Sequence, residues 1–443
     1  MRGVSVVFAA GLLVGCSFDP SANVAGGGDG GPTGGDAGPD AGPCDEPLHA
    51  EMTVNGTASA ASGEPFVTVL IGDSVQLSAA GSCTESGTIE YVWSITGDGD
   101  GDAIEGTAAP DLASAVVDVY PVARGDYTVT LAVSDGTSTS DPLSVFAFRA
   151  IAWQASAEAL DIRDLATTTA TLWVAASAGA YQLPLADVLG TPSLVNDLAG
   201  GDDDIPNDLS ASAAGLGGTV WFGHKPNDSL VWRVDTDNGR VTAIDFTPNF
   251  EDAVVEDIGR GETGIVLATR DGVVEAPDNQ TFEAPLITAQ SFAVTRGGSG
   301  GWAGGAKLYQ LPAGTEFDLF GVDDNKIRAL LEVDGEIWAG ADDPGVAVFD
   351  PGTLTVTSIF TTANGLPSNK VRAIAVDTTG DVWLATDRGV ARYKQDRAVW
   401  VAMGAGTGIG SIDVRAVTAV GAGAARKIIA GTHDGVSLLT LPQ

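Results

Sequence analysis

The chain has 443 residues, of which 58 are acidic and 22 basic, giving a formal net charge of −36. Such a negative field repels nucleic acid and anionic membrane surfaces, so neither is expected as a direct partner. The sequence contains no HExxH motif and no P-loop, which excludes the metalloprotease and nucleotide sites that are most easily found from sequence.

The first residues have the features of a targeting segment. Arg2 supplies a positive charge, and Val4–Val14 is an apolar run too short to span a bilayer, which takes about 20 residues. Leu13-Val14-Gly15-Cys16 resembles the bacterial lipobox, in which cleavage precedes a cysteine that then carries lipid. We expect residues 1–15 to be a lipoprotein signal peptide and Cys16 to be the lipid attachment site. An ordinary secretion signal that contains a cysteine is the alternative.

Residues 16–45 are rich in Gly, Pro, Ala and Asp, a composition that cannot bury apolar surface and is typical of a disordered tether. A lipid and a tether would hold a globular part off a membrane, so the anchor is the only membrane contact expected. Ser17 follows the cysteine where the enteric rule for inner-membrane retention has Asp. The sequence therefore favours the cell envelope, at the outer membrane or the cell surface.

Lipidation of Cys16 would leave Cys44 and Cys83 as a pair in an oxidising compartment. We expect a disulfide between them, and two free thiols are the alternative.

Residues 46–148 contain three segments in which apolar and polar residues alternate, as in half-buried strands. They are Gly72–Ser78, Ile89–Ser94 and Tyr127–Gly136. Their order resembles an immunoglobulin-like sandwich of the polycystic-kidney-disease (PKD) type, whose Tyr-x-Trp strand, here Tyr91–Trp93, packs in the core. The resemblance implies an N-terminal β-sandwich that serves as a spacer or an adhesion module.

Residues 149–443 repeat a pattern of short strands about every 40 residues. The clearest copy, Asn364–Lys394, has predicted strands at Val371–Val376, Asp381–Thr386 and Gly389–Tyr393. It resembles the repeat of two-component regulator propellers, with its Gly-Leu-Pro start, its Asp-x-x-Gly turn and its Trp before a Thr. The copies align on an apolar anchor in the middle strand: Trp173, Trp221, Val266, Trp302, Trp338, Trp383 and Ile429.

These copies predict an all-β chain with a β-propeller of about seven blades after the sandwich; an array of β-sandwiches is the alternative. Small residues after several anchors, as in Trp221-Phe-Gly and Trp338-Ala-Gly, would let neighbouring blades pack closely. The last copy ends after its third strand, Val436–Leu441, although a blade normally has four. We expect the segment Leu143–Gln154, around Phe146–Trp153, to supply the missing outer strand and close the ring.

Arginine recurs at one register, about ten residues before the anchor and at the start of the innermost strand. In blade order this position holds Arg163, Ser210, Glu256, Phe292, Arg328, Arg372 and Arg415. Four arginines would thus form an arc at the channel mouth, where bidentate recognition of a carboxylate or sulfate is one function. In the alternative, each arginine pairs with an acid of a neighbouring blade, such as Asp164, Asp377 or Asp413, and holds the blades together.

Catalytic and metal-binding signals are few. His224 and His433 follow their anchors and are expected on the face of the arginine arc, an arrangement similar to that of propeller lyases such as streptogramin lyase, although chance can also produce it. Asp98, Asp100 and Asp102 could bind calcium, but Ala103 stands where an EF-hand loop has Gly, so a solvated acidic loop is the alternative. No cofactor is expected.

We interpret the chain as a non-catalytic, lipid-anchored envelope protein that displays its propeller to a glycan, peptide or protein ligand. One alternative is a propeller lyase or hydrolase acting on an anionic glycan or a cyclic substrate, and enzymatic activity is therefore left open. Another is a structural component of a surface assembly. A binder tolerates the loss of an acid or base that an enzyme needs.

Overall fold

The computed structural model describes residues 48–58, 64–84, 89–97, 114–121, 124–195, 205–226, 228–261, 264–278, 280–297, 300–322, 325–395 and 398–442. Within these ranges the regular structure is all strand apart from two 3-10 turns, Thr362–Asn364 and Gly423–Ala425, which confirms the all-β fold class. None of the helical segments in the described ranges is long and apolar enough to cross a membrane.

The N-terminal part consists of two sheets, ordered β1-β3-β5 and β2-β7-β6-β4. Only β2 and β7 pair in parallel among these neighbours. The strands are β1 (Thr53–Val54), β2 (Val67–Leu70), β3 (Val75–Ser78), β4 (Glu90–Gly97), β5 (Val116–Val119), β6 (Gly125–Ser134) and β7 (Leu143–Ile151).

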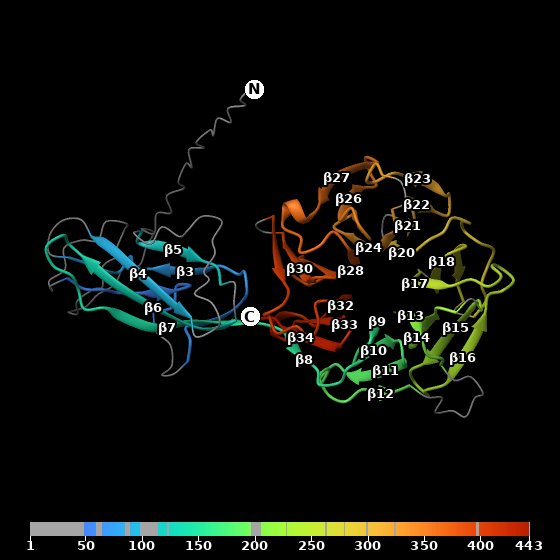
Figure 1. Ribbon diagram of the computed structural model, residues 1–443, viewed down its shortest axis with the longest axis horizontal. Helices are drawn as coiled ribbons and strands as arrows, with labels where there is room; N and C mark the ends of the chain where they lie inside the picture. Colours follow the sequence, from blue (N-terminus) through green and yellow to red (C-terminus); the bar gives the residue numbers. More distant parts are fainter. Residues whose placement is uncertain are drawn as a thin grey trace, which may run out of the picture.

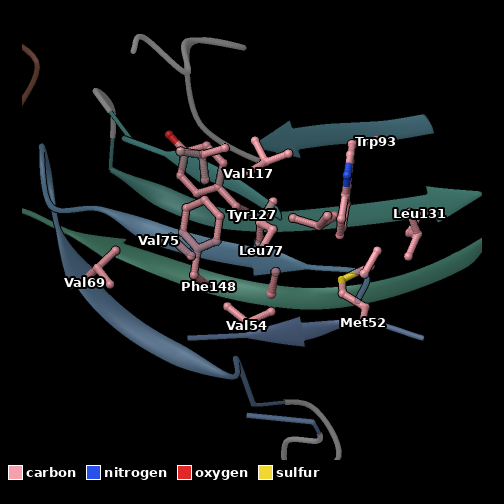
Figure 2. Close-up of a cluster of buried hydrophobic side chains, with 14 of the residues drawn as sticks. Met52, Val54, Val69, Val75, Leu77, Trp93, Val117, Tyr127, Leu131 and Phe148 are labelled. Carbon is pink, nitrogen blue, oxygen red and sulfur yellow. The ribbon is translucent and has the colours of Figure 1, made fainter. Parts of the chain in front are cut away.

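The two sheets share one apolar core, which Figure 2 shows. Every second residue of β6 from Tyr127 to Val133 is buried, as the alternating sequence predicts. Tyr127 stacks on Phe148 with ring centroids 4.7 Å apart. Trp93 is 3% exposed and donates its indole N–H to the Ser114 carbonyl oxygen (2.9 Å), so its predicted place in the core is confirmed.

Seven sheets, counted over the described residues, follow in a closed ring (Figure 1). We call them blades one to seven. They are β9 (Ile162–Thr167) to β12 (Ser193–Leu194), β13 (Leu209–Ala214) to β16 (Val241–Asp245), β17 (Val255–Arg260) to β19 (Gly272–Ala276), β20 (Ala293–Gly297) to β23 (Thr315–Phe317), β24 (Ile327–Val333) to β27 (Thr355–Phe360), β28 (Val371–Val376) to β31 (Val399–Met403), and β32 (Val414–Val420) to β34 (Gly435–Thr440) with β8 (Gln154–Ala155). The first strand of each blade contacts the first strand of the next, and β32 contacts β9, so these strands surround the ring centre.

All seven predicted anchors are buried in the second strand of their blade. These strands are β10 (Thr171–Ala176), β14 (Thr219–His224), β18 (Ile265–Thr269), β21 (Gly300–Gly304), β25 (Glu336–Ala341), β29 (Val382–Thr386) and β33 (Lys427–Thr432). The glycines that follow the anchors explain the close packing. A Cβ on Gly340 would lie 2.5 Å from Val371 of blade six, and one on Gly223 would lie 2.6 Å from Val255 of blade three.

The last blade is closed by a segment that precedes the first blade, as predicted. The closing strand is β8, Gln154–Ala155, at the end of the predicted segment and one residue beyond it. Ala155 of β8 pairs with Ser437 of β34. The predicted strand Leu143–Gln154 is wrong for most of its length, because Leu143–Ile151 is β7 and buries Phe148 in the sandwich core. A strand held between β2 and β6 cannot also pair with β34. Because β7 ends at Ile151, the sandwich extends past residue 148, where we expected it to end.

The sandwich contacts the outer strands of blade six (Figure 1). Asp73, between β2 and β3, accepts hydrogen bonds from Arg392 (2.9 Å) and Lys394 (2.5 Å) of β30 (Gly389–Lys394). Leu70 shares an apolar cluster with Trp153 and with Trp383 of blade six. The contact is therefore both ionic and apolar, and it lies at the rim of the ring.

Trp153 joins the two parts, since its backbone N–H donates to the Thr407 carbonyl oxygen (3.0 Å) and its side chain is 2% exposed. We expect Trp153→Ala to destabilise the chain by about 3–5 kcal/mol, because a large cavity would open beside the closing strand. Val92→Ala, at a side chain that is 59% exposed, should change the stability by less than about 0.5 kcal/mol. Urea unfolding of both variants measures this, and equal midpoints would rule out the closure role of Trp153.

Candidate functional site

The starts of the seven inner strands surround a cavity of about 360 Å³ at the ring centre, which we call the mouth cavity. All seven positions of the predicted arginine register line it, together with Lys225, Asp342 and Lys370. The side chains at this register therefore all meet at the ring centre, including those of the three blades that have Ser210, Glu256 or Phe292 in place of arginine.

A β-bulge produces this convergence in six blades. In blade six, Val371 lies opposite Thr386 and Ala373 opposite Ala385, so Arg372 between them has no partner across the ladder. The same shift occurs at Arg163, Ser210, Glu256, Arg328 and Arg415. Because a bulge frees one residue from the alternation of the strand, its side chain can turn into the mouth.

Three of the arginines form a chain of ion pairs across blades six, seven and one. Arg372 pairs with Asp413, which also accepts from Arg415 (3.0 Å). Arg415 pairs in turn with Asp161, which also accepts from Arg163 (2.8 Å). The predicted tie between blades is therefore present for Arg372 and Asp413, and each carboxylate bridges two guanidinium groups.

These contacts affect the ionisation of the bridging acids. Partial burial opposes the charge of Asp161, but the hydrogen bond from His433 and the charges of Arg163 and Arg415 outweigh it and lower its pKa. Burial likewise opposes the charge of Asp413, and Arg372 and then Arg415 lower its pKa below the ordinary value. Both acids are therefore carboxylates at neutral pH.

Arg328 contacts residues of two other blades across the mouth. Its Nε donates to Asp342 (3.1 Å) and its Nη1 to Glu256 of blade three (3.3 Å). Its guanidinium carbon lies 4.3 Å from the ring centroid of Phe292, a cation–π contact. Arg328 thereby links blade five to blades three and four.

The mouth cavity carries an excess of positive charge. Six cationic side chains line it, against the two carboxylates Glu256 and Asp342: Arg163, Lys225, Arg328, Lys370, Arg372 and Arg415. The ammonium groups of Lys225 and Lys370 form no ion pair with any residue that the structure describes. The buried Nε of Arg163 also has no acceptor among these residues. The cavity is thus equipped to attract an anion in a chain of net charge −36.

The two histidines differ in their surroundings. His224 is 7% exposed, packs edge-on against Trp232 and has its Nδ1 2.8 Å from Asp228. The side chain of His433 is 53% exposed, and its Nδ1 lies 3.0 Å from Asp161. Neither is among the residues that line the mouth cavity, and only His433 touches a residue of the ion-pair chain.

Several predicted sites lie outside the described residues: Cys16, Cys44, Asp98, Asp100 and Asp102. Lipidation, the pairing of Cys44 with Cys83 and calcium binding therefore stay predictions. In the part of the chain that the structure describes, no group of three or more His, Cys, Asp and Glu side chains is placed to hold a metal ion.

Two acids of the inner strands are largely surrounded by protein. Asp164 of β9 accepts from the backbone N–H of Ser212 in the next blade (2.7 Å), and Asp257 of β17 accepts from that of Val294 (2.8 Å). Burial, with a contribution from Asp257, raises the pKa of Asp164 to about 7. Burial also raises the pKa of Asp257 to about 6. Asp164, which could have paired with an arginine, thus serves a neighbouring backbone instead.

Comparisons with known proteins agree with this architecture. A family model described as two component regulator propeller matches residues 365–388. The extracellular domain assigned to a hybrid two component system of B. thetaiotaomicron is similar in structure, with 16% sequence identity and a TM-score of 0.54 over 70% of this chain and 43% of that one. A chain of the mitotic checkpoint complex is similar over 66% of this chain and 94% of that one, with 10% identity and a TM-score of 0.52.

No curated protein matches the sequence. At these identities the structural similarities show the fold alone, and this chain spans less than half of the B. thetaiotaomicron domain. The matched repeat lies in blade six, from the turn before β28 through β29. The part of the sequence closest to the family is therefore one that also contributes Lys370 and Arg372 to the mouth cavity.

The raised pKa of Asp164 gives a pH-dependent stability. The folded state keeps its proton up to about pH 7, whereas an ordinary aspartate loses it near 3.8, so this stabilisation is complete below pH 3.8 and is lost as the pH rises towards 7. We expect Asp164→Asn, whose amide oxygen can still accept from Ser212, to melt higher than the wild type above pH 7 and at the same temperature near pH 4. Melting curves across this range test it. A variant that melts lower than the wild type above pH 7, but equally near pH 4, would show that ionised Asp164 stabilises the fold.

Proposed function

We propose that the protein is a non-catalytic binding protein of the cell envelope and that its propeller takes an anionic ligand at the mouth cavity. The excess of cationic over acidic side chains in that cavity carries the proposal. Guanidinium and ammonium groups bind carboxylate and sulfate by charge-assisted hydrogen bonds, which are stronger than neutral ones. A cavity of about 360 Å³ suits a small acid or the acidic group of a glycan or peptide.

The lysines are better suited than the arginines to a free ligand. Arg372, Arg415 and Arg328 already have carboxylate partners in Asp413, Asp161 and Glu256, so a ligand would have to compete with these ion pairs. Lys225 and Lys370 have no such partner within the described ranges, so a ligand can bind them without breaking an ion pair. The arginines would then position the ligand and hold the blades together.

The alternative of a lyase has less support. Its catalytic histidines were to be His224 and His433, but His224 is packed against Trp232. His433 has Asp161 as a partner, and Asp161 is also held by Arg163 and Arg415. A catalytic acid or base must contact the substrate. Neither histidine lines the mouth cavity, so the arrangement favours binding there over catalysis by these histidines.

A double variant separates ligand binding from stability. We expect Lys225→Gln with Lys370→Gln to weaken succinate binding by about tenfold for each lysine, since a charged hydrogen bond is worth about 1.5–3 kcal/mol. Its melting temperature should stay close to that of the wild type. Calorimetric titration at low salt measures the affinity, because salt screens partly exposed charges.

The matched control removes two exposed cations elsewhere, with Arg240→Gln and Lys307→Gln. It has the same net charge as the lysine variant and should bind succinate like the wild type. Equal affinity of all three proteins, or no succinate binding by the wild type, would contradict an anion site at the mouth.

Envelope anchoring is the second part of the proposal, and it is supported by the Leu-Val-Gly-Cys pattern ahead of the tether-like segment. We expect Cys16→Ala to move the protein from the membrane fraction to the soluble fraction, because a tether alone has no membrane affinity. Cys44→Ala should stay with the membrane. Membrane retention of Cys16→Ala, together with a wild-type protein free of lipid mass, would contradict the anchor.

A further inference from the structure

The backbone of Lys225 is held in place by a hydrogen bond of its own and by the contacts of the residue before it. It is the first residue after β14, and its backbone N–H donates to the Asp208 carbonyl oxygen (3.2 Å). The preceding His224 is fixed by Trp232 and by Asp228. The base of the lysine side chain is therefore set by the fold, and the side chain lines the mouth cavity.

Charged groups from three inner strands and from the loop before β13 act on Lys225. Arg163 and Arg415 are cationic, and Asp208 and Glu256 are anionic. Burial above all, and then the charges of the two arginines, outweigh the two carboxylates and lower the pKa of Lys225 below the ordinary value for a lysine. Near neutral pH such a lysine has a larger share of neutral amine, which is the form that attacks a carbonyl carbon.

We propose that the mouth takes a 2-oxo acid and that Lys225 reacts with its carbonyl carbon to form an imine. This inference rests on the proposed anion-binding function and names a class of ligand for it. In a 2-oxo acid the carboxylate adjoins the electrophilic carbon. Arg163, whose buried Nε has no acceptor among the described residues, can bind that carboxylate, and the carbonyl carbon is then held in the same cavity that Lys225 lines.

The reaction is balanced by the amine, the acid and water. The Nζ lone pair forms a bond to the carbonyl carbon, and the carbonyl oxygen takes up a proton as the nitrogen loses one, giving a carbinolamine. The hydroxyl group then leaves as water with the second nitrogen proton, giving the imine. No oxidant or reductant is consumed, and hydrolysis reverses both steps.

Reductive trapping tests this directly, because the chain has six lysines: Lys225, Lys307, Lys326, Lys370, Lys394 and Lys427. The full-length protein is incubated with pyruvate and cyanoborohydride, and the modification of each lysine is measured by peptide mass spectrometry. We expect Lys225 to be modified about tenfold faster than the mean of the other five. Acetone, which has the carbonyl group without the carboxylate, should show no such preference, and equal labelling of the six lysines by pyruvate would overturn the inference.

Binding measurements provide an independent test. We expect the wild type to bind pyruvate about tenfold more tightly than lactate, which has a hydroxyl in place of the carbonyl, and Lys225→Arg to lose this difference because it keeps the charge but cannot form an imine. Lys307→Arg, outside the mouth, should keep it. A wild type that binds pyruvate and lactate equally would overturn the imine.

The two proposals can fail separately. Succinate binding with uniform lysine labelling leaves the anion site intact and removes the imine. Selective labelling of Lys225 without measurable succinate binding leaves a reactive lysine and removes the anion site.

Discussion

The bulge at the start of the inner strands is the constraint on which the mouth depends. In blade six, Val371 before the bulge is fully buried against Gly340 of the preceding blade, and Ala373 after it returns to the ladder opposite Ala385. Packing therefore fixes both neighbours, while the bulged residue between them is free of the core. That position holds Arg, Ser or Glu in different blades while the strands around it keep the same packing, so the residues of the mouth can differ between blades on one scaffold.

The same regularity explains how much could be read from the sequence. Each anchor and each arginine recurs with the blade, so one clear repeat at Asn364–Lys394 was enough to find buried Trp173 and mouth-lining Arg163. A second register, two residues upstream of the bulge, holds Asp161, Lys370 and Asp413. The sequence shows this second register, but it does not show which of its residues form ion pairs. The ring geometry places Asp413 against two arginines and leaves Lys370 without a carboxylate partner among the described residues.

Features that depend on the whole ring could not be predicted. Arg328 reaches Glu256 across an intervening blade, a contact that exists only when blades three to five are assembled side by side. The closing strand is predicted at Leu143–Gln154 because this strand-like segment precedes the first blade and the last blade lacks a fourth strand, yet β7 has two partners in the sandwich and leaves only Gln154–Ala155 for β34. The sequence of an apolar segment between two domains is compatible with burial in either core. The strands with which it pairs determine the core in which it is buried.

The contact between sandwich and propeller determines what the mouth can meet. The Arg392 side chain is 6% exposed, pairs with Asp381 (2.6 Å), lies over Trp383 and still reaches Asp73 of the sandwich. A buried guanidinium with two carboxylates is costly to separate, so the sandwich is expected to stay on the rim of blade six. Its contacts there involve Arg392, Lys394 and the cluster around Leu70, none of which lines the mouth cavity. The sandwich therefore occupies the rim of the ring and leaves the cationic mouth at the ring centre uncovered by its contacts.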